Sequence, residues 1–144
     1  MRIAAILALA LLLSACGSVT PVPVKVGEVC ETCKKQITDL RFAAEAITQQ
    51  GDVLKFGTPE CLATYVRLHP EAIAAKFVTD YTSGRFIRPE SATYVRTIID
   101  ENTRERSYAA FAQVNDAVKF AKDQLSSPID WLMIQRMSAG KKSK

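Results

Sequence analysis

The sequence predicts an α+β fold built as one small domain. Two short strand-like segments separated by a turn come first, and a helix with clear start and stop residues follows them. A further strand, a second pair of strand-like segments and a long amphipathic segment come next. This order of strands and helices favours the α+β class. The 144 residues are enough for one hydrophobic core and too few for two.

The first predicted elements of the domain are a loop and a hairpin. Residues 30–38 contain two cysteines and are expected to form the loop. Strand-forming side chains occupy residues 42–48 and 53–56, and the Gln-Gly-Asp sequence at 50–52 supplies turn residues between them. We therefore expect these two segments to pair as a β-hairpin.

A helix is predicted directly after this hairpin. Thr58 is a favourable N-cap residue, and Pro59 suits the first helical position because an N–H is not needed there. Apolar side chains then recur at helical spacing until Pro70, which ends the helix.

The second half of the chain is predicted to contain three more strands and one more helix. Residues 74–79 form the first strand, and residues 94–99 and 107–112 form two others around a charged loop. Residues 114–125 keep the apolar spacing of an amphipathic helix. Residues 127–144 are expected to be a C-terminal apolar segment with a basic tail.

The N-terminus indicates export and lipid anchoring. An apolar run at 3–13 is too short to span a bilayer, and it leads into Leu-Ser-Ala-Cys, which resembles the bacterial lipobox. Residues 1–15 are therefore predicted to be a lipoprotein signal peptide, and Cys16 the lipidated residue. The alternative is an ordinary signal peptide with a cysteine near its cleavage site. Residues 16–27 contain few core-forming side chains and are predicted to be a tether to the membrane.

Composition and motifs exclude several classes of function. The net charge of +4 is spread along the chain, so the dense basic surface of a nucleic-acid-binding protein is not expected. No later stretch approaches the ~18 apolar residues of a membrane-spanning helix. The sequence lacks a serine-hydrolase elbow, a zinc-hydrolase motif and a Gly-rich phosphate loop, so no enzyme is expected.

Three cysteines of the expected mature chain form a candidate metal site. Cys30 and Cys33 have CxxC spacing, and Cys61 is the third residue of the predicted helix, where free N–H groups and the helix dipole favour a thiolate. Lys34 and Lys35 would stabilise a neighbouring thiolate or dock an acidic partner. Two or three thiolates without an oxygen ligand suit the soft ion Cu(I).

Other roles for these residues remain open at this stage. Cys30 and Cys33 would form a disulfide or a redox pair in an oxidising compartment, and Cys61 would be a small buried core residue. His69, the only histidine, is expected to be a surface or capping residue at the end of the helix and not a ligand.

Five segments of the chain form a recognisable set between about residue 30 and residue 123. They are the CxxC pair, the Phe-Gly-Thr-Pro-Glu-Cys turn at 56–61, V-x-D-Y-x-x-G at 78–84, A-x-Y-V at 92–95, and the strand end and helix at 110–120. Together and in this order they resemble the NosL family, lipoproteins that accompany nitrous oxide reductase and handle copper for it. The resemblance implies a NosL-like domain at 28–126 with two ββα units of the treble-clef kind, related to the organomercurial lyase fold.

Two positions depart from the family's pattern. The family's CxxCGM motif carries a methionine where this chain has Lys35, and its G-P-M-G turn carries one where this chain has Arg104. Neither cation can bind Cu(I). Met133 and Met137 lie four residues apart and would share one face of a helix. We expect them to pack onto the domain, with membrane docking and metal ligation as the other possible roles.

The combined prediction is a non-enzymatic, lipid-anchored accessory protein of the cell envelope that faces the periplasm. It would bind Cu(I) with Cys30 and Cys33 as the main ligands and Cys61 as the third, and pass it to a partner such as nitrous oxide reductase or its maturation machinery. The alternative is an envelope interaction module with the same fold, in which the CxxC is a disulfide or thiol-redox pair without a copper role. Detoxification of organomercurials would rest on fold analogy alone.

Overall fold

The computed structural model describes residues 19–140 of the chain and has the predicted α+β architecture. The predicted loop, both hairpins, the single strand and both helices all occur, within one or two residues of their expected bounds. In chain order the elements are η1 (Leu40–Phe42, a 3-10 turn), β1 (Ala44–Thr48), β2 (Val53–Phe56), α1 (Pro59–Leu68), β3 (Ile73–Thr79), β4 (Phe86–Ile87), η2 (Pro89–Ser91, a 3-10 turn), β5 (Thr93–Asp100), β6 (Glu105–Phe111), α2 (Val114–Gln124) and α3 (Trp131–Gly140).

Three details differ from the sequence prediction. The first strand begins at Ala44 and not at Phe42, because Asp39 accepts a hydrogen bond from the Arg41 amide and caps the turn η1. The two-residue strand β4 was not predicted, since it is too short to show an alternating pattern. The apolar C-terminal segment folds as the helix α3. Hairpin and helix follow one another in β1–β2–α1 and in β5–β6–α2, while the treble-clef description stays a prediction.

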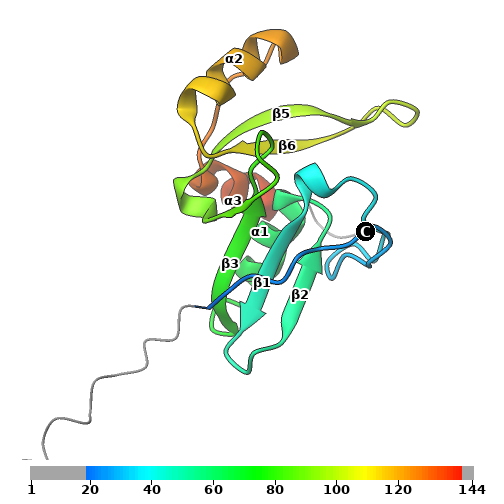
Figure 1. Ribbon diagram of the computed structural model, residues 1–144, viewed down its shortest axis with the longest axis vertical. Helices are drawn as coiled ribbons and strands as arrows, with labels where there is room; N and C mark the ends of the chain where they lie inside the picture. The colour runs from blue at the N-terminus through cyan, green and yellow to red at the C-terminus, as the bar shows by residue number, and fades with distance from the viewer. Residues whose placement is uncertain (1–18, 141–144) are drawn as a thin grey trace, which may run out of the picture.

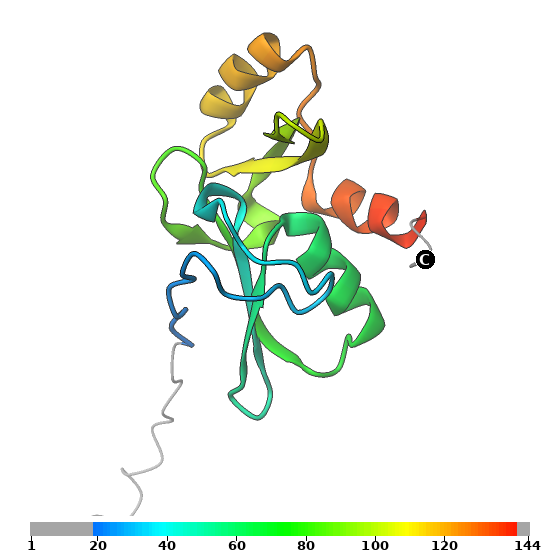
Figure 2. The same ribbon diagram turned by 90° about the vertical axis from the view of Figure 1, so that its right-hand side faces the viewer.

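The larger sheet is antiparallel throughout, with the strand order β2-β1-β3-β4. Every residue of the central strand β1 is buried, because both of its faces are covered. Helix α1 packs against one face, and the segment before the cysteine loop crosses the other, as Figures 1 and 2 show. Ala44 and Ala46 belong to the same apolar cluster as Leu62 of α1.

A buried ion pair fixes the N-terminal segment to this sheet. Glu45 of β1 is fully buried and bonds to Lys55 of β2 at 2.7 Å. The second oxygen of Glu45 accepts the Val22 amide at 2.8 Å, and the Lys55 ammonium donates to the Val22 carbonyl at 2.6 Å. Val24 is also buried. We call residues 22–28 the N-terminal strap. The tether was expected to extend to residue 27, but its described end, from Val22, packs on the domain.

The second hairpin and α2 form a smaller layer with an apolar cluster of their own. Strands β5 and β6 pair in a two-stranded antiparallel sheet. Thr97 of β5 donates a hydrogen bond to Gln124 of α2 at 2.6 Å. The buried side chains of this cluster are Phe42, Val95, Ala109, Phe111, Ala117 and Ala121.

Asp80, in the V-x-D-Y-x-x-G segment, connects the larger sheet to the second hairpin through hydrogen bonds. Its carboxylate accepts the Ala112 amide at 3.0 Å and the Ser83 amide at 3.0 Å. The Tyr81 amide donates to the Ala110 carbonyl of β6 at 2.7 Å. Gly84 closes the turn at a φ of +71°, in the left-handed region that favours glycine.

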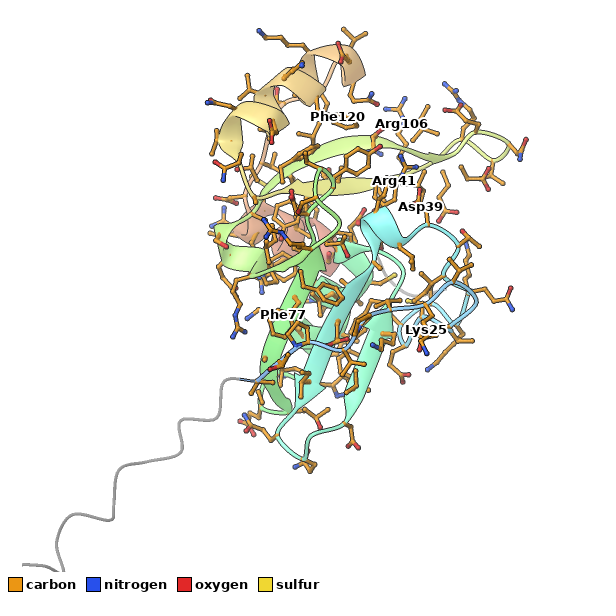
Figure 3. All side chains as sticks on the ribbon, viewed as in Figure 1. Lys25, Asp39, Arg41, Phe77, Arg106 and Phe120 are labelled. Carbon is orange, nitrogen blue, oxygen red and sulfur yellow. The ribbon has the colours of Figure 1, made fainter. Side chains whose placement is uncertain are left out.

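Figure 3 shows Arg41 beside Asp39 at the same junction, and the Arg41 guanidinium also donates to the Tyr81 hydroxyl at 3.0 Å. At the end of α1, His69 is the C-cap residue: its amide donates to the Tyr65 carbonyl at 2.9 Å, and its ring packs against the Tyr65 ring.

Candidate metal centre

The fold brings three cysteines from distant parts of the sequence together. The sulfur atoms of Cys30, Cys33 and Cys61 lie within 4.8 Å of one another. Cys30 is buried, Cys61 is half-buried and Cys33 is exposed. All three are free thiols. Among the residues from 19 to 140, no other group of three or more His, Cys, Asp or Glu side chains converges in this way.

The loop that carries Cys30 and Cys33 is held by main-chain hydrogen bonds on both sides. The Cys30 amide donates to the Lys35 carbonyl at 2.9 Å, and the Lys34 amide donates to the Cys30 carbonyl at 2.9 Å. The Glu31 amide donates to the Lys55 carbonyl of β2 at 2.8 Å. The loop geometry is thus tied to the strand that also carries the buried ammonium.

Helix α1 positions the third sulfur. Thr58 is the N-cap, and its hydroxyl accepts the Cys61 amide at 3.2 Å. The Cys61 carbonyl accepts the Thr32 hydroxyl at 2.8 Å, so a side chain between the two loop cysteines bonds directly to the helix. The predicted N-cap and the predicted third helical position of Cys61 are therefore as observed.

The pKa values of Cys30 and Cys61 are shifted in opposite directions. The Cys61 thiol donates to the Cys30 sulfur and, with smaller contributions from the Cys33 and Gly57 amides, lowers the pKa of Cys30 to about 5 despite its burial. Donation to Cys30 and burial raise the pKa of Cys61 above its usual range. The helix N-terminus was expected to favour a thiolate at Cys61. The hydrogen bond between the two thiols and desolvation act against that expectation and raise the pKa of Cys61.

The two lysines of the loop contact carboxylates. The Lys34 ammonium lies 2.9 Å from Glu31, and the Lys35 ammonium lies 3.4 Å from Glu105 at the start of β6. Both pairs are largely solvent-exposed. The main contributions to the shifted pKa of Cys30 come from thiol and amide donors. A role of Lys34 and Lys35 in docking or in stabilising a thiolate stays a prediction.

The two positions at which the family pattern carries methionine lie on neighbouring turns. Lys35 follows Lys34, which has a φ of +58° at the position of the pattern's glycine. Arg104 has a φ of +57° in the turn between β5 and β6, and its guanidinium bonds to Glu101 at 3.2 Å. The Lys35–Glu105 pair links these turns, so charged side chains occupy the region where the pattern has sulfur.

Helix α3 packs on the domain through its aromatic and aliphatic side chains. Trp131 and Ile134 of this helix are buried in the main core. Met133 and Met137 are 40% and 41% exposed, and the Met137 sulfur accepts a contact from the Tyr108 hydroxyl at 3.6 Å. The apolar segment therefore packs on the domain as expected, whereas its two methionines lie largely at the surface.

The sequence alone did not identify the residues whose hydrogen bonds and ion pair hold the cysteine loop in place. Thr32 was passed over as a spacer of the CxxC, although a hydroxyl there can bond to a neighbouring main chain. Glu45 and Lys55 stand opposite each other in the first hairpin. A lone acidic residue in the otherwise apolar Ala-Glu-Ala-Ile strand was the available signal that a charge is buried and paired there.

Three of the sequence predictions concern residues outside the described range. The signal peptide at 1–15 and Cys16, expected to carry the lipid, precede residue 19, and the basic tail from residue 141 onward follows the last described residue. Within the described range, none of the helices has the length and apolar character needed to cross a membrane.

Comparisons with known proteins agree with this architecture. The model of the NosL family matches residues 21–127. The crystal structure of the copper chaperone NosL from Shewanella denitrificans superposes with a TM-score of 0.65 at 15% sequence identity, covering 77% of this chain and 92% of that one. A search of curated proteins finds no match. The family match confirms both the resemblance and the prediction of a non-enzymatic protein. The chain belongs to the NosL family.

Proposed function

We propose that this protein is a copper carrier of the cell envelope that binds Cu(I) through Cys30, Cys33 and Cys61 and passes it to an acceptor protein. The observation that carries the proposal is the convergence of three sulfur atoms within 4.8 Å. Three sulfurs without an oxygen or nitrogen ligand match the preference of Cu(I) for soft donors and its low coordination number. The chain also belongs to the family of a solved protein described as a copper chaperone.

The electrostatics of the cluster support binding of a cation. The pKa of Cys30 is lowered to about 5, so one ligand is a thiolate at neutral pH before any metal arrives. A metal cation that approaches this thiolate displaces the remaining thiol protons, because metal binding favours deprotonated cysteines. The paired ammonium groups of Lys34 and Lys35 lie next to the loop and would offset part of the resulting negative charge.

Metal binding is tested with the reduced mature protein under oxygen-free conditions. We expect about one Cu(I) per chain, with thiolate-to-copper absorption in the near ultraviolet. The Cys30→Ser/Cys33→Ser double variant should lose this binding, whereas Met133→Leu/Met137→Leu, the matched control on α3, should keep it. Unchanged copper binding in the double cysteine variant would rule out the proposed site.

The alternative is a thiol-redox or disulfide role for the CxxC pair in an interaction module. The adjacency of three free thiols also favours this chemistry, because neighbouring thiols form disulfides readily in an oxidising compartment. A thiol count on protein isolated without oxygen separates the two functions. Three reactive thiols together with tight copper binding support the carrier, and one reactive thiol without copper binding supports the alternative.

The proposal includes lipid anchoring at Cys16. The strap is fixed to the sheet from Val22, six residues after Cys16, so the chain between them reaches about 20 Å at most. A lipid at Cys16 would thus keep the domain next to the membrane, within reach of a membrane-bound or periplasmic acceptor such as nitrous oxide reductase or its maturation machinery. Cys16→Ser should move the protein out of the membrane fraction. Unchanged fractionation and electrophoretic mobility would contradict the anchor.

A further inference from the structure

The three cysteines differ in how far solvent reaches them. Cys30 is 1% exposed, and Cys61 is half-buried on the first turn of α1. Cys33 is exposed. An incoming ligand must reach bonding distance of the metal, so it approaches from the side on which the site is open. That side is the one occupied by Cys33.

Cys30 and the half-buried Cys61 are also held by more hydrogen bonds than Cys33. Cys30 has its amide and its carbonyl bonded to Lys35 and Lys34 of its own loop. Cys61 has its amide bonded to the N-cap Thr58, and its carbonyl receives the Thr32 hydroxyl. Cys33 belongs to the surface turn at 31–33, where its amide donates to the Cys30 sulfur and the neighbouring ion pair between Lys34 and Glu31 is exposed to solvent.

We propose that Cys30 and Cys61 are the two sulfurs that hold Cu(I), and that Cys33 is the ligand an acceptor displaces first. This inference rests on the proposed copper-carrier function and deepens it. It also reverses the ranking expected from the CxxC spacing, in which Cys30 and Cys33 are the main pair and Cys61 the third ligand.

The exchange step is a ligand substitution at Cu(I). A sulfur of the acceptor, either a thiolate or a thioether, forms a bond to copper from the Cys33 side. The bond between copper and the Cys33 sulfur then breaks, and the released thiolate takes a proton from water. Copper stays Cu(I), so no oxidant or reductant is required. The acceptor is thereby defined as a protein that presents an exposed cysteine or methionine sulfur.

Three single variants of the mature protein test the ranking: Cys30→Ser, Cys33→Ser and Cys61→Ser. Copper affinity is measured by competition with bathocuproine disulfonate, a chelator that absorbs on binding Cu(I), and the number of sulfur ligands by X-ray absorption. We expect three sulfurs in the unaltered protein and two in Cys33→Ser, with an affinity loss of about tenfold or less. Cys30→Ser and Cys61→Ser should lose about a hundredfold or more.

The rate of copper removal gives a second readout. In Cys33→Ser the solvent-facing coordination position is vacant, so the chelator should remove copper faster than from the unaltered protein. Circular dichroism checks that each variant is folded. Because the Cys33 side chain is exposed, Cys33→Ser should fold normally and decides the ranking even if Cys30→Ser or Cys61→Ser unfolds the domain.

The outcomes separate the two proposals. Absence of Cu(I) binding in the unaltered protein would overturn the copper-carrier function and this inference with it. Tight binding in the unaltered protein, together with a loss in Cys33→Ser of about a hundredfold or more, would overturn only the ranking and restore the CxxC pair as the holding ligands.

Discussion

The two units β1–β2–α1 and β5–β6–α2 have the same order of elements but are stabilised in different ways. The first contains a buried ion pair between Glu45 and Lys55, a side-chain cap on its helix and a cysteine on the first helical turn. The second has a neutral hydrogen bond between Thr97 and Gln124, and its helix begins without a side-chain cap. The difference indicates that the polar interactions of the first unit are those that position the cysteine cluster.

The connection of the ion pair to the site supports this interpretation. The Lys55 side chain holds the strap, while the Lys55 carbonyl accepts the Glu31 amide between the two loop cysteines. Thr58 caps the helix through the Cys61 amide itself. In the second unit, the comparable groups contact only helix and strand, so their loss should affect stability without a separate effect on the site.

The largest expected effect follows from breaking the ion pair. Lys55→Met leaves the fully buried Glu45 carboxylate without its cation, and removal of one partner of a buried pair lowers stability by about 3–5 kcal/mol. The counterpart in the second unit, Thr97→Val, should lower stability by about 1 kcal/mol, since Gln124 is half-buried and water can replace the hydroxyl.

Chemical denaturation of the mature protein measures both variants. Glu45→Gln added to Lys55→Met should recover part of the loss, because it removes the unpaired charge. Equal effects of Lys55→Met and Thr97→Val would contradict the difference between the units.

The next largest effect is a pH dependence of stability caused by the Cys30 thiolate of the first unit. The pKa of Cys30 is about 5 in the folded protein, below the usual thiol value, so the folded state binds fewer protons than the unfolded state between these values. Stability from this group is therefore fully present above the usual thiol pKa and is lost as the pH falls toward about 5.

Cys61→Ala removes the thiol donor and should raise the pKa of Cys30 toward the usual thiol value. Thiolate absorbance in the ultraviolet, followed against pH in Cys33→Ser with and without Cys61→Ala, measures the change at Cys30 directly. A titration that does not move when Cys61 is replaced would show that another group lowers the pKa.

Helix capping should give a smaller effect, of opposite sign in the two units. Thr58→Ala removes the cap of α1 and should lower stability by about 1 kcal/mol. Gln113 has an extended backbone and no side-chain cap bond, so Gln113→Asp should add a cap to α2 and raise stability by about 0.5–1 kcal/mol. Thermal unfolding measures both changes, with Gln113→Ala as the control. Destabilisation by Gln113→Asp would show that the start of α2 cannot accept a cap.

The smallest expected effect concerns the ion pair that connects the units at the surface. Lys35 and Glu105 are 3.4 Å apart and about half or more exposed, so Glu105→Gln should change stability by about 0.2–1 kcal/mol, and by less at high salt. Unfolding at low and high salt provides the measurement. A salt-independent loss above this range would identify the pair as a structural link and not a surface contact.

The sequence by itself determined the order of the elements and the class of chemistry. Thr58 and Pro59 mark the start of α1 because capping and proline geometry are local properties, and Gly51 marks the hairpin turn for the same reason. The thiol side chains pointed to a soft metal ion because ligand preference depends on atom type. The CxxC also placed two sulfurs near each other, since only two residues separate them.

The tertiary structure alone decided how these groups act together. Cys61 reaches Cys30 because the loop bonds to β2 and to the helix, contacts between residues far apart in the chain. The hydrogen bond between the two sulfurs lowers the pKa of Cys30 against the effect of its burial, and this contact exists only in the folded chain. Val22 joins the domain because Glu45 accepts its amide and Lys55 donates to its carbonyl, and these two charged residues lie on neighbouring strands. Solvent access and hydrogen-bond partners depend on what the folded chain packs against each group, so local sequence could not specify them.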